Sequence, residues 1–193
     1  MAGDWRYITL GDFVALQRGH DLTEPERRIG RVPVMGSAGQ NGFHDTALSK
    51  GPGIVIGRSG ASFGQVHFTK EDFWPHNTGL YVTDFKGNDP IFAFYLLKAL
   101  DFTYFALKEF DLITLNRGST QPLLTQTDLK RQSFVLPTNE VVKAFADVSE
   151  PIFRQMVSNK KESRTLATLR DTLLPKLLSG EITTDNIRKV QTQ

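Results

Sequence analysis

The sequence contains no cysteine. This absence excludes a disulfide framework, a thiolate zinc site and a cysteine nucleophile, and it is typical of proteins from a reducing compartment. The four histidines, His20, His44, His67 and His76, do not follow the spacing of metal ligands. We therefore expect no metal site in this chain.

Long apolar runs are also missing. No stretch reaches the length of a transmembrane helix, and the first residues do not resemble a signal peptide. We therefore expect a cytoplasmic protein that has no membrane partner. The 193 residues, of which 39% are hydrophobic, are sufficient for one domain with an ordinary core and an appendage.

Catalytic motifs are missing as well. The glycine-rich segment 57–64 is not followed by the Gly-Lys-Ser/Thr sequence of a phosphate loop, and it is not a dinucleotide fingerprint. Ala61 occupies the position where a nucleophile elbow carries its second glycine. The Asn/Asp-Pro-Pro-aromatic tetrapeptide of amino-group methyltransferases does not occur, so we do not expect this chain to methylate a base itself.

A large excess of positive charge is absent too. The formal net charge is +2, and residues 1–137 carry 14 basic and 14 acidic side chains. Residues 138–193 are slightly basic, with 9 Lys or Arg and 7 Asp or Glu. A neutral domain lacks the usual electrostatic signature of nucleic-acid binding. Charge alone therefore does not predict a DNA ligand.

Residues 1–137 are rich in glycine, phenylalanine and proline and predict one compact mixed domain of the α+β class. Short runs of β-branched and aromatic residues, bounded by glycine or proline, predict its strands. These runs lie at 33–35, 54–56, 80–83 and 134–136, after a strand or turn over 5–13. Asp89 as N-cap and Pro90 at the first helical position predict a buried helix over residues 91–100.

Residues 138–180 predict a helical arm, and residues 181–193 a short tail. Thr138 is suited to the N-cap of the arm, since its hydroxyl can accept a hydrogen bond from the first turn. Pro151 lacks the amide proton that a helix interior needs. We therefore expect the helix to kink or restart near Ser149.

Apolar residues of the arm recur at the seven-residue spacing of a coiled coil, interrupted by one asparagine. The predicted contact positions are Ile152, Asn159, Leu166, Leu169, Leu173 and Leu177. A helix over residues 151–178 would be roughly 40 Å long, whereas a domain of the size of residues 1–137 has a radius of gyration of about 14 Å. We therefore predict that the arm forms an antiparallel coiled coil with a partner. An amphipathic helix folded onto its own domain is the alternative.

Four polar loops carry Arg, Gln, Asn and Ser side chains, which can bind base edges and phosphates. They lie at 36–44, 57–65, 76–78 and 116–121. The candidate DNA-binding residues in them are Ser37, Gln40, Asn41, Arg58, Ser59, Ser62, Gln65, His76, Asn77, Thr78, Arg117, Ser119, Thr120 and Gln121. A surface turn is the alternative for each loop, because turns also favour glycine and short polar residues.

The sequence resembles the specificity (S) subunit of Type I restriction–modification systems over nearly its whole length. The resemblance rests on Trp5, Leu10–Asp12, Gly57–Gly64, Trp74–Pro75, Asn77–Thr78, Gly118–Pro122, Leu136–Pro137 and Leu169–Ile182. The last two segments are the more specific, whereas the glycine-rich segment is not specific alone. The resemblance implies that residues 1–137 are a target recognition domain and that the arm is a conserved spacer helix.

The resemblance also implies what the protein does and what it binds. Such a domain reads one half of a split sequence in double-stranded DNA, while the helix sets the spacing and docks methyltransferase (M) subunits. The S subunit has no catalytic activity, so S-adenosylmethionine is expected in the M subunit, and a restriction (R) subunit is a further partner of such complexes. Family members usually carry two recognition domains, whereas this chain has one, which implies a homodimer.

Two other classes of function remain as alternatives. An autonomous hydrolase would use Ser59 and His76, and a nuclease would use the Asp-x-Lys segments 84–86 or 128–130. Activity of the purified chain alone would support either enzyme. The third possibility is an interaction protein whose coiled coil pairs with a full-length S subunit and modulates its assembly.

Overall fold

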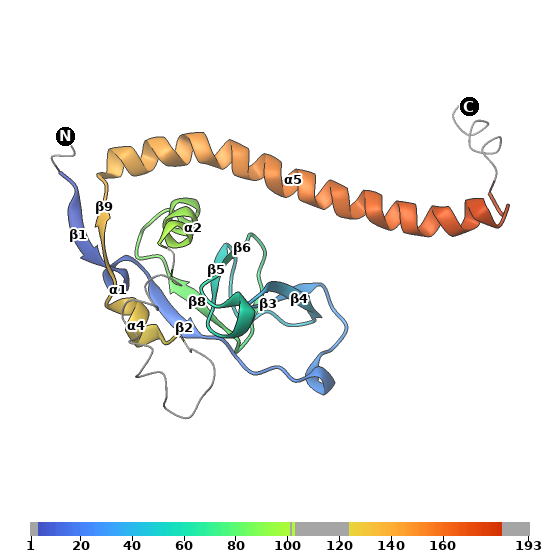
Figure 1. Ribbon diagram of the computed structural model, residues 1–193, viewed down its shortest axis with the longest axis horizontal. Coiled ribbons are helices and arrows are strands. Elements are labelled where there is room, and N and C mark those ends of the chain that lie inside the picture. The colour runs from blue at the N-terminus through green and yellow to red at the C-terminus, as the bar shows by residue number, and fades with distance from the viewer. Residues whose placement is uncertain (1–3, 101, 103–123, 183–193) are drawn as a thin grey trace. The chain divides into compact units, whose positions relative to one another are not determined.

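The computed structural model describes residues 4–100, 102 and 124–182 (Figure 1). Contacts divide the chain into two compact units, residues 1–146 and 147–193. The first unit combines short strands and helices, and the second contains most of one long helix, α5 (Asn139–Leu178). The predicted α+β class with a long C-terminal helix is therefore confirmed.

A four-stranded antiparallel sheet forms the centre of the first unit. Its strands, in spatial order, are β2 (Ala15–Arg18), β8 (Gly79–Asp84), β5 (Gly53–Gly57) and β6 (Val66–Thr69). The strands predicted at 54–56 and 80–83 are confirmed as β5 and β8, the two central strands. β6 was not predicted, because its four residues follow a glycine-rich turn and mix polar with apolar side chains.

A second sheet has three strands, in the order β4 (Gly39–His44), β3 (Val32–Gly36) and β7 (Trp74–Pro75). β3 and β7 are parallel, whereas β3 and β4 form an antiparallel hairpin. The predicted strand at 33–35 is confirmed, but the polar loop predicted over 36–44 is too long. Only Ser37 and Ala38 separate the strands, because Gly39, with φ of +89°, reverses the chain at once.

A third, two-stranded sheet joins the beginning and the end of the first unit. β1 (Arg6–Thr9) is antiparallel to β9 (Ser133–Leu136), which confirms the strand predicted at 134–136. Two short helices, α1 (Leu10–Phe13) and α4 (Gln126–Lys130), lie against each other beside it. The backbone N–H of Leu10 donates to the Gln132 carbonyl at 2.7 Å and fixes this arrangement.

The core links the sheets to the helices through aromatic side chains. Met35, Val55, Phe73 and Tyr81 form a buried cluster that joins β3 to β5 and β8. A side chain at Gly53 has no room there, since its Cβ would lie 2.1 Å from the Phe73 ring. The central sheet therefore owes its close packing partly to a glycine at the start of β5.

Helix α2 (Pro90–Ala99) packs its apolar side chains into this core. Its N-cap is Asp89, whose carboxylate accepts a hydrogen bond from the Phe92 N–H at 2.7 Å. The Phe13 ring of α1 lies 6.2 Å from that of Phe92 and 5.3 Å from that of Phe134. Phe94 contacts Phe68 of β6 at 5.4 Å. The helix predicted from Asp89 and Pro90 is confirmed.

Helix α5 begins at Asn139, directly after the predicted N-cap Thr138, and continues without interruption to Leu178. Of the predicted kink or restart near Ser149, the restart is therefore wrong. Pro151 removes one backbone hydrogen bond. The helical turns on both sides of it keep theirs, and in a helix of 40 residues the loss of one bond does not end the helix.

The side chains of α5 are largely exposed, and only Ser149 and Phe153 among them are buried. The side chains at all six predicted contact positions are exposed. The leucines at 166 and 173 retain 57% and 39% of their surface. Despite its length, α5 is too polar to cross a bilayer, and no other described helix meets the requirements for doing so.

Replacing Asp89 with alanine should destabilise the first unit, because α2 loses the acceptor for its first-turn N–H group. We expect the free energy of unfolding to fall by about 1 kcal/mol, as measured by urea denaturation. The Asp89→Asn variant keeps a capping oxygen and should stay close to the parent. An equal loss in both variants would show that the capping bond is not what stabilises α2.

Candidate nucleic-acid interface

The segment 76–78 lies between β7 and β8 and is fixed on both sides by backbone hydrogen bonds. The His76 N–H donates to the Met35 carbonyl at 2.8 Å, and the Asn77 N–H donates to the His20 carbonyl at 2.9 Å. The Gly79 N–H closes the turn by donating to the His76 carbonyl at 3.0 Å. The end of β3 and the end of β2 therefore hold the segment in one conformation.

A glycine allows this close approach. The chain after β2 passes so near to the segment 76–78 that a Cβ at Gly19 would lie 2.2 Å from the His76 carbonyl oxygen. The Gly19 N–H also donates to the Gly79 carbonyl at 3.0 Å. A larger residue at position 19 would separate these two segments, and the hydrogen bond from Asn77 to His20 would be lost with the contact.

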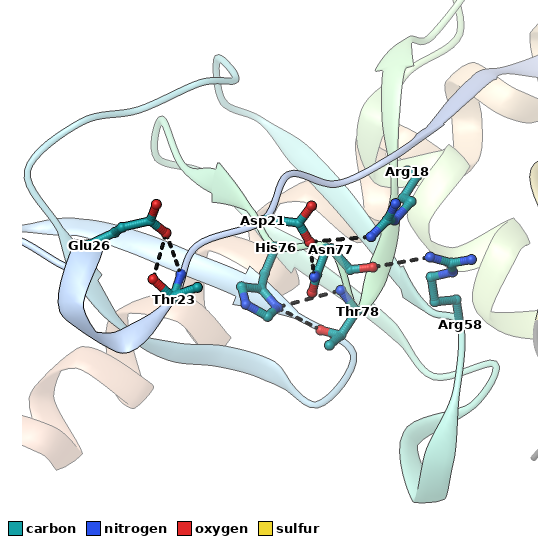
Figure 2. A network of polar contacts seen from close by, with 8 residues as sticks. All are labelled: Arg18, Asp21, Thr23, Glu26, Arg58, His76, Asn77 and Thr78. Carbon is teal, nitrogen blue, oxygen red and sulfur yellow. Dashed lines mark hydrogen bonds and ion pairs between the residues drawn. The ribbon is translucent and has the colours of Figure 1, made fainter.

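The turn of the β3–β4 hairpin contacts the same segment. The Ser37 N–H donates to Thr78 Oγ1 at 3.2 Å, and Thr78 Oγ1 lies 3.0 Å from His76 Nδ1 (Figure 2). On the other side of the turn, His67 Nε2 lies 2.8 Å from the Ser37 carbonyl oxygen. Ser37 is thus fixed between two histidine-bearing segments.

The glycine-rich loop 57–65 reaches the segment through Arg58. The Arg58 N–H donates to the Thr78 carbonyl at 3.1 Å, and its Nη1 donates to the Asn77 carbonyl at 3.4 Å (Figure 2). The loop itself contains a single 3₁₀ turn over Gly60–Ser62 and is closed by the Gly57 N–H, which donates to the Gln65 carbonyl at 2.8 Å.

Residues from three predicted loops thus meet around 76–78. The fourth loop, with Arg117, Ser119, Thr120 and Gln121, lies outside the described residues. Gln40 and Asn41 belong to strand β4 and not to a loop, which corrects the interpretation of 36–44. Their segment is a hairpin because β4 pairs with β3 along almost its whole length.

The candidate residues differ in exposure. The amide side chains of Gln40, Asn41 and Gln65 are exposed to the solvent. The other described candidates are half-buried. These are Ser37, Arg58, Ser59, Ser62, His76, Asn77 and Thr78. Several of these half-buried residues form the hydrogen bonds that hold the loops together. Their role in organising the surface is therefore distinct from contact with a ligand.

Two charged residues of this cluster, Arg18 and Asp21, were not among the candidates predicted from the sequence. Arg18, at the end of β2, donates from Nη2 to Asp21 Oδ1 at 3.3 Å, and Asn77 Nδ2 donates to the same oxygen. The charged loop that follows is closed by a 3₁₀ turn over Glu24–Glu26, where the Thr23 hydroxyl donates to Glu26 at 2.7 Å. The sequence signal for this ion pair was an arginine at the end of a strand with an aspartate three residues after it.

Burial controls the charge of the central histidine. It lowers the pKa of His76, a shift that the nearby Arg27 reinforces and that a backbone hydrogen bond with Leu22 opposes. His76 is therefore neutral at neutral pH. A neutral imidazole suits a hydrogen bond with the Thr78 hydroxyl and contributes no charge to an anion site.

The enzymatic alternatives gain no support from this geometry. The ring of His76 contacts Thr78 and the backbone of Leu22, and no hydrogen bond connects it to Ser59. Within the described ranges, no three acidic or histidine side chains gather in a way that would hold a metal ion. The cluster instead presents amide and guanidinium groups on a framework of backbone hydrogen bonds.

Comparison with known proteins connects this chain to a family. The family described as "Type I restriction modification DNA specificity domain" matches residues 2–166. The MjaIX specificity subunit of Methanocaldococcus jannaschii is 30% identical over 83 residues, which are 43% of this chain and 19% of that protein. The HindI specificity subunit of Haemophilus influenzae is 31% identical over 90 residues, which are 44% of this chain and 20% of that protein.

A solved structure shares the fold. The Type I S subunit from M. genitalium superimposes with a TM-score of 0.70 at 21% identity, over 90% of this chain and 45% of that one. The match therefore covers about half of that structural relative and about one fifth of each curated relative. The predicted resemblance is confirmed, and the family consists of DNA-specificity proteins that are not catalytic. The chain belongs to the family of Type I restriction–modification specificity proteins.

Proposed function

We propose that this protein is the sequence-reading subunit of a Type I-like restriction–modification methyltransferase complex in the cytoplasm. It binds double-stranded DNA through the loops around 76–78, pairs with a second copy through α5 and docks M subunits, with an R subunit as a further partner. The observation that carries the proposal is the meeting of three separate polar segments at one place, in a chain of the specificity family.

The exposed amides supply chemistry for reading bases. Asn and Gln can donate to and accept from adenine in the major groove, whereas Arg pairs with guanine. Gln40, Asn41 and Gln65 are exposed on the described part of the surface, and Arg117 and Gln121 are proposed readers in the segment outside it. A surface that combines these groups can distinguish base pairs even though residues 1–137 are neutral as a whole.

Helix α5 supplies the second half of the proposal. With 40 residues it is about 60 Å long, and its seven-spaced positions Ile152, Asn159, Leu166 and Leu173 are exposed. An antiparallel coiled coil of two copies would bury these side chains together with Leu169 and Leu177. Asn159 then restricts the register, as a single polar residue does in such a seam.

Pairing also accounts for the length of the relatives. The chain covers 45% of the matched S subunit, so two copies together have about the length of that protein. Two identical readers related by a two-fold axis require a bipartite palindrome as target. The cofactor S-adenosylmethionine belongs to the M subunits. The exposed seam of α5 also fits the second candidate, an interaction protein that pairs with a full-length S subunit.

Charges in the seam should produce monomers. We expect the double variant Leu166→Glu/Leu173→Glu to have half the mass of the parent in light scattering, because four carboxylates would meet in the buried seam of the dimer. The control variant Lys161→Glu/Thr168→Glu changes positions with the same spacing on the far side of α5. A parent that is already monomeric, or a variant of unchanged mass, would contradict pairing through this seam.

The purified chain should transfer no methyl group to DNA on its own. Together with an M subunit it should confer methylation of adenine at one specific sequence, which can be followed with radiolabelled S-adenosylmethionine and by sequencing of methylated bases. Activity of the chain alone would contradict the proposal. A non-palindromic target would instead support pairing with another S polypeptide.

The length of α5 should determine the spacer of the target. Deleting one heptad between residues 152 and 172 shortens the helix by roughly 10 Å, the length of about three base-pair steps, and preserves the seam. Mapped methylation sites should keep both half-sites and acquire a different spacer. Replacing the same heptad with another of equal length and seam pattern is the control, and its spacer should not change.

A further inference from the structure

Two arginines from different strands meet at Asn77. Arg18 lies at the end of β2 and Arg58 directly after β5, and Figure 2 shows both on the same side of Asn77. Arg58 donates to the Asn77 carbonyl at 3.4 Å, while the Asn77 side chain and Arg18 share the Oδ1 atom of Asp21. One short network therefore positions both guanidinium groups.

The charges of this network do not balance. Arg18 pairs with the Asp21 carboxylate, whereas Arg58 forms no ion pair with a carboxylate among the described residues, and His76 beside them is neutral. Burial lowers the pKa of Arg58, and the positive charge of Arg18 nearby lowers it further. Both nevertheless stay charged at neutral pH.

A hydrogen-bond donor of this network is also unused. Arg58 Nε is buried and has no hydrogen-bond partner among the residues that the structure describes. Buried donors are normally paired, and two cations in proximity are stabilised by an anion placed between them. The network therefore lacks a negatively charged hydrogen-bond acceptor for this donor.

We propose that Arg18 and Arg58 together bind one backbone phosphate of the target DNA. The proposal rests on the proposed function; it adds Arg18 to the interface and assigns Arg58, a candidate DNA-binding residue, to a phosphate. Such a contact fixes the register of the duplex but carries no sequence information. It places the exposed amides of the neighbouring loops at the bases.

The geometry favours a phosphate over a base edge. Reading guanine requires one guanidinium in the plane of the base with two free donors. Arg58 is held by the Asn77 carbonyl and Arg18 by Asp21, so neither is free to follow a base. A phosphate accepts hydrogen bonds from several directions, which suits two guanidinium groups that approach from different strands.

The test uses the assembled complex with its M subunits. Its affinity is measured over a range of salt concentrations for two duplexes, one with the sequence that the complex methylates and one with a scrambled sequence. We expect Arg18→Gln and Arg58→Gln each to lower the affinity of the complex for both duplexes by the same factor, roughly tenfold. The slope of log K against log salt should fall by about 0.9 in the double variant, the value for one phosphate. The two effects should not be additive, since both residues bind one group.

Two sets of variants serve as controls. Arg6→Gln removes the same charge from β1, in the separate two-stranded sheet, and should leave the salt slope unchanged. Arg18→Lys and Arg58→Lys keep the charge and should retain most of the affinity, because lysine also binds phosphate as a point charge. If Arg58→Gln fails to fold, as judged by thermal unfolding, Arg18→Gln and the lysine variants decide the result.

The outcomes separate this proposal from the proposed function. A loss confined to the methylated sequence would make the arginines base readers, and unchanged binding would remove them from the interface; either result overturns the phosphate site. A parent complex that binds both duplexes equally would contradict the proposed function, while the salt slopes would still decide the phosphate site. A parent that binds no DNA would overturn both.

Discussion

The hydrogen bonds of the segment 76–78 are the contacts on which the whole interface depends. Its backbone bonds to β3, to the residue after Gly19 and to Arg58, so one short segment sets the positions of three others. Because these bonds join main-chain atoms, the side chains between them can differ without loss of the framework. Such a framework suits a surface whose ligand preference depends on exposed side chains of its loops.

The long helix imposes a second constraint. Helix α5 exposes several leucines, and a large exposed apolar surface is typical of a contact site, which is why we propose a partner for this helix. In the proposed dimer the same residues define the distance between two readers. Stability of the pair and choice of the DNA target therefore depend on one seam, and a change of helix length alters specificity without touching a base contact.

The sequence predicted the parts of the molecule in which local chemistry decides. Asp89 with Pro90 predicted α2, and the β-branched run at 54–56 predicted the centre of β5. Pairings over long distances could not be predicted: the parallel contact of β3 with β7 joins residues about 40 positions apart. Arg18 and Asp21 were missed for the same reason, because only the folded sheet brings them to Asn77. The restart predicted from Pro151 was wrong because the effect of one proline on a long helix depends on the intact turns around it.

We propose that the loops around 76–78 face the DNA, and a structure of the complex, with its M subunits and a duplex that carries the target sequence, would decide this. We expect Gln40, Asn41 or Gln65 to lie at base edges in the major groove, with Arg18 and Arg58 at one phosphate. A duplex bound on the β1–β9 sheet, with the loops 36–44, 57–65 and 76–78 in solvent, would contradict it.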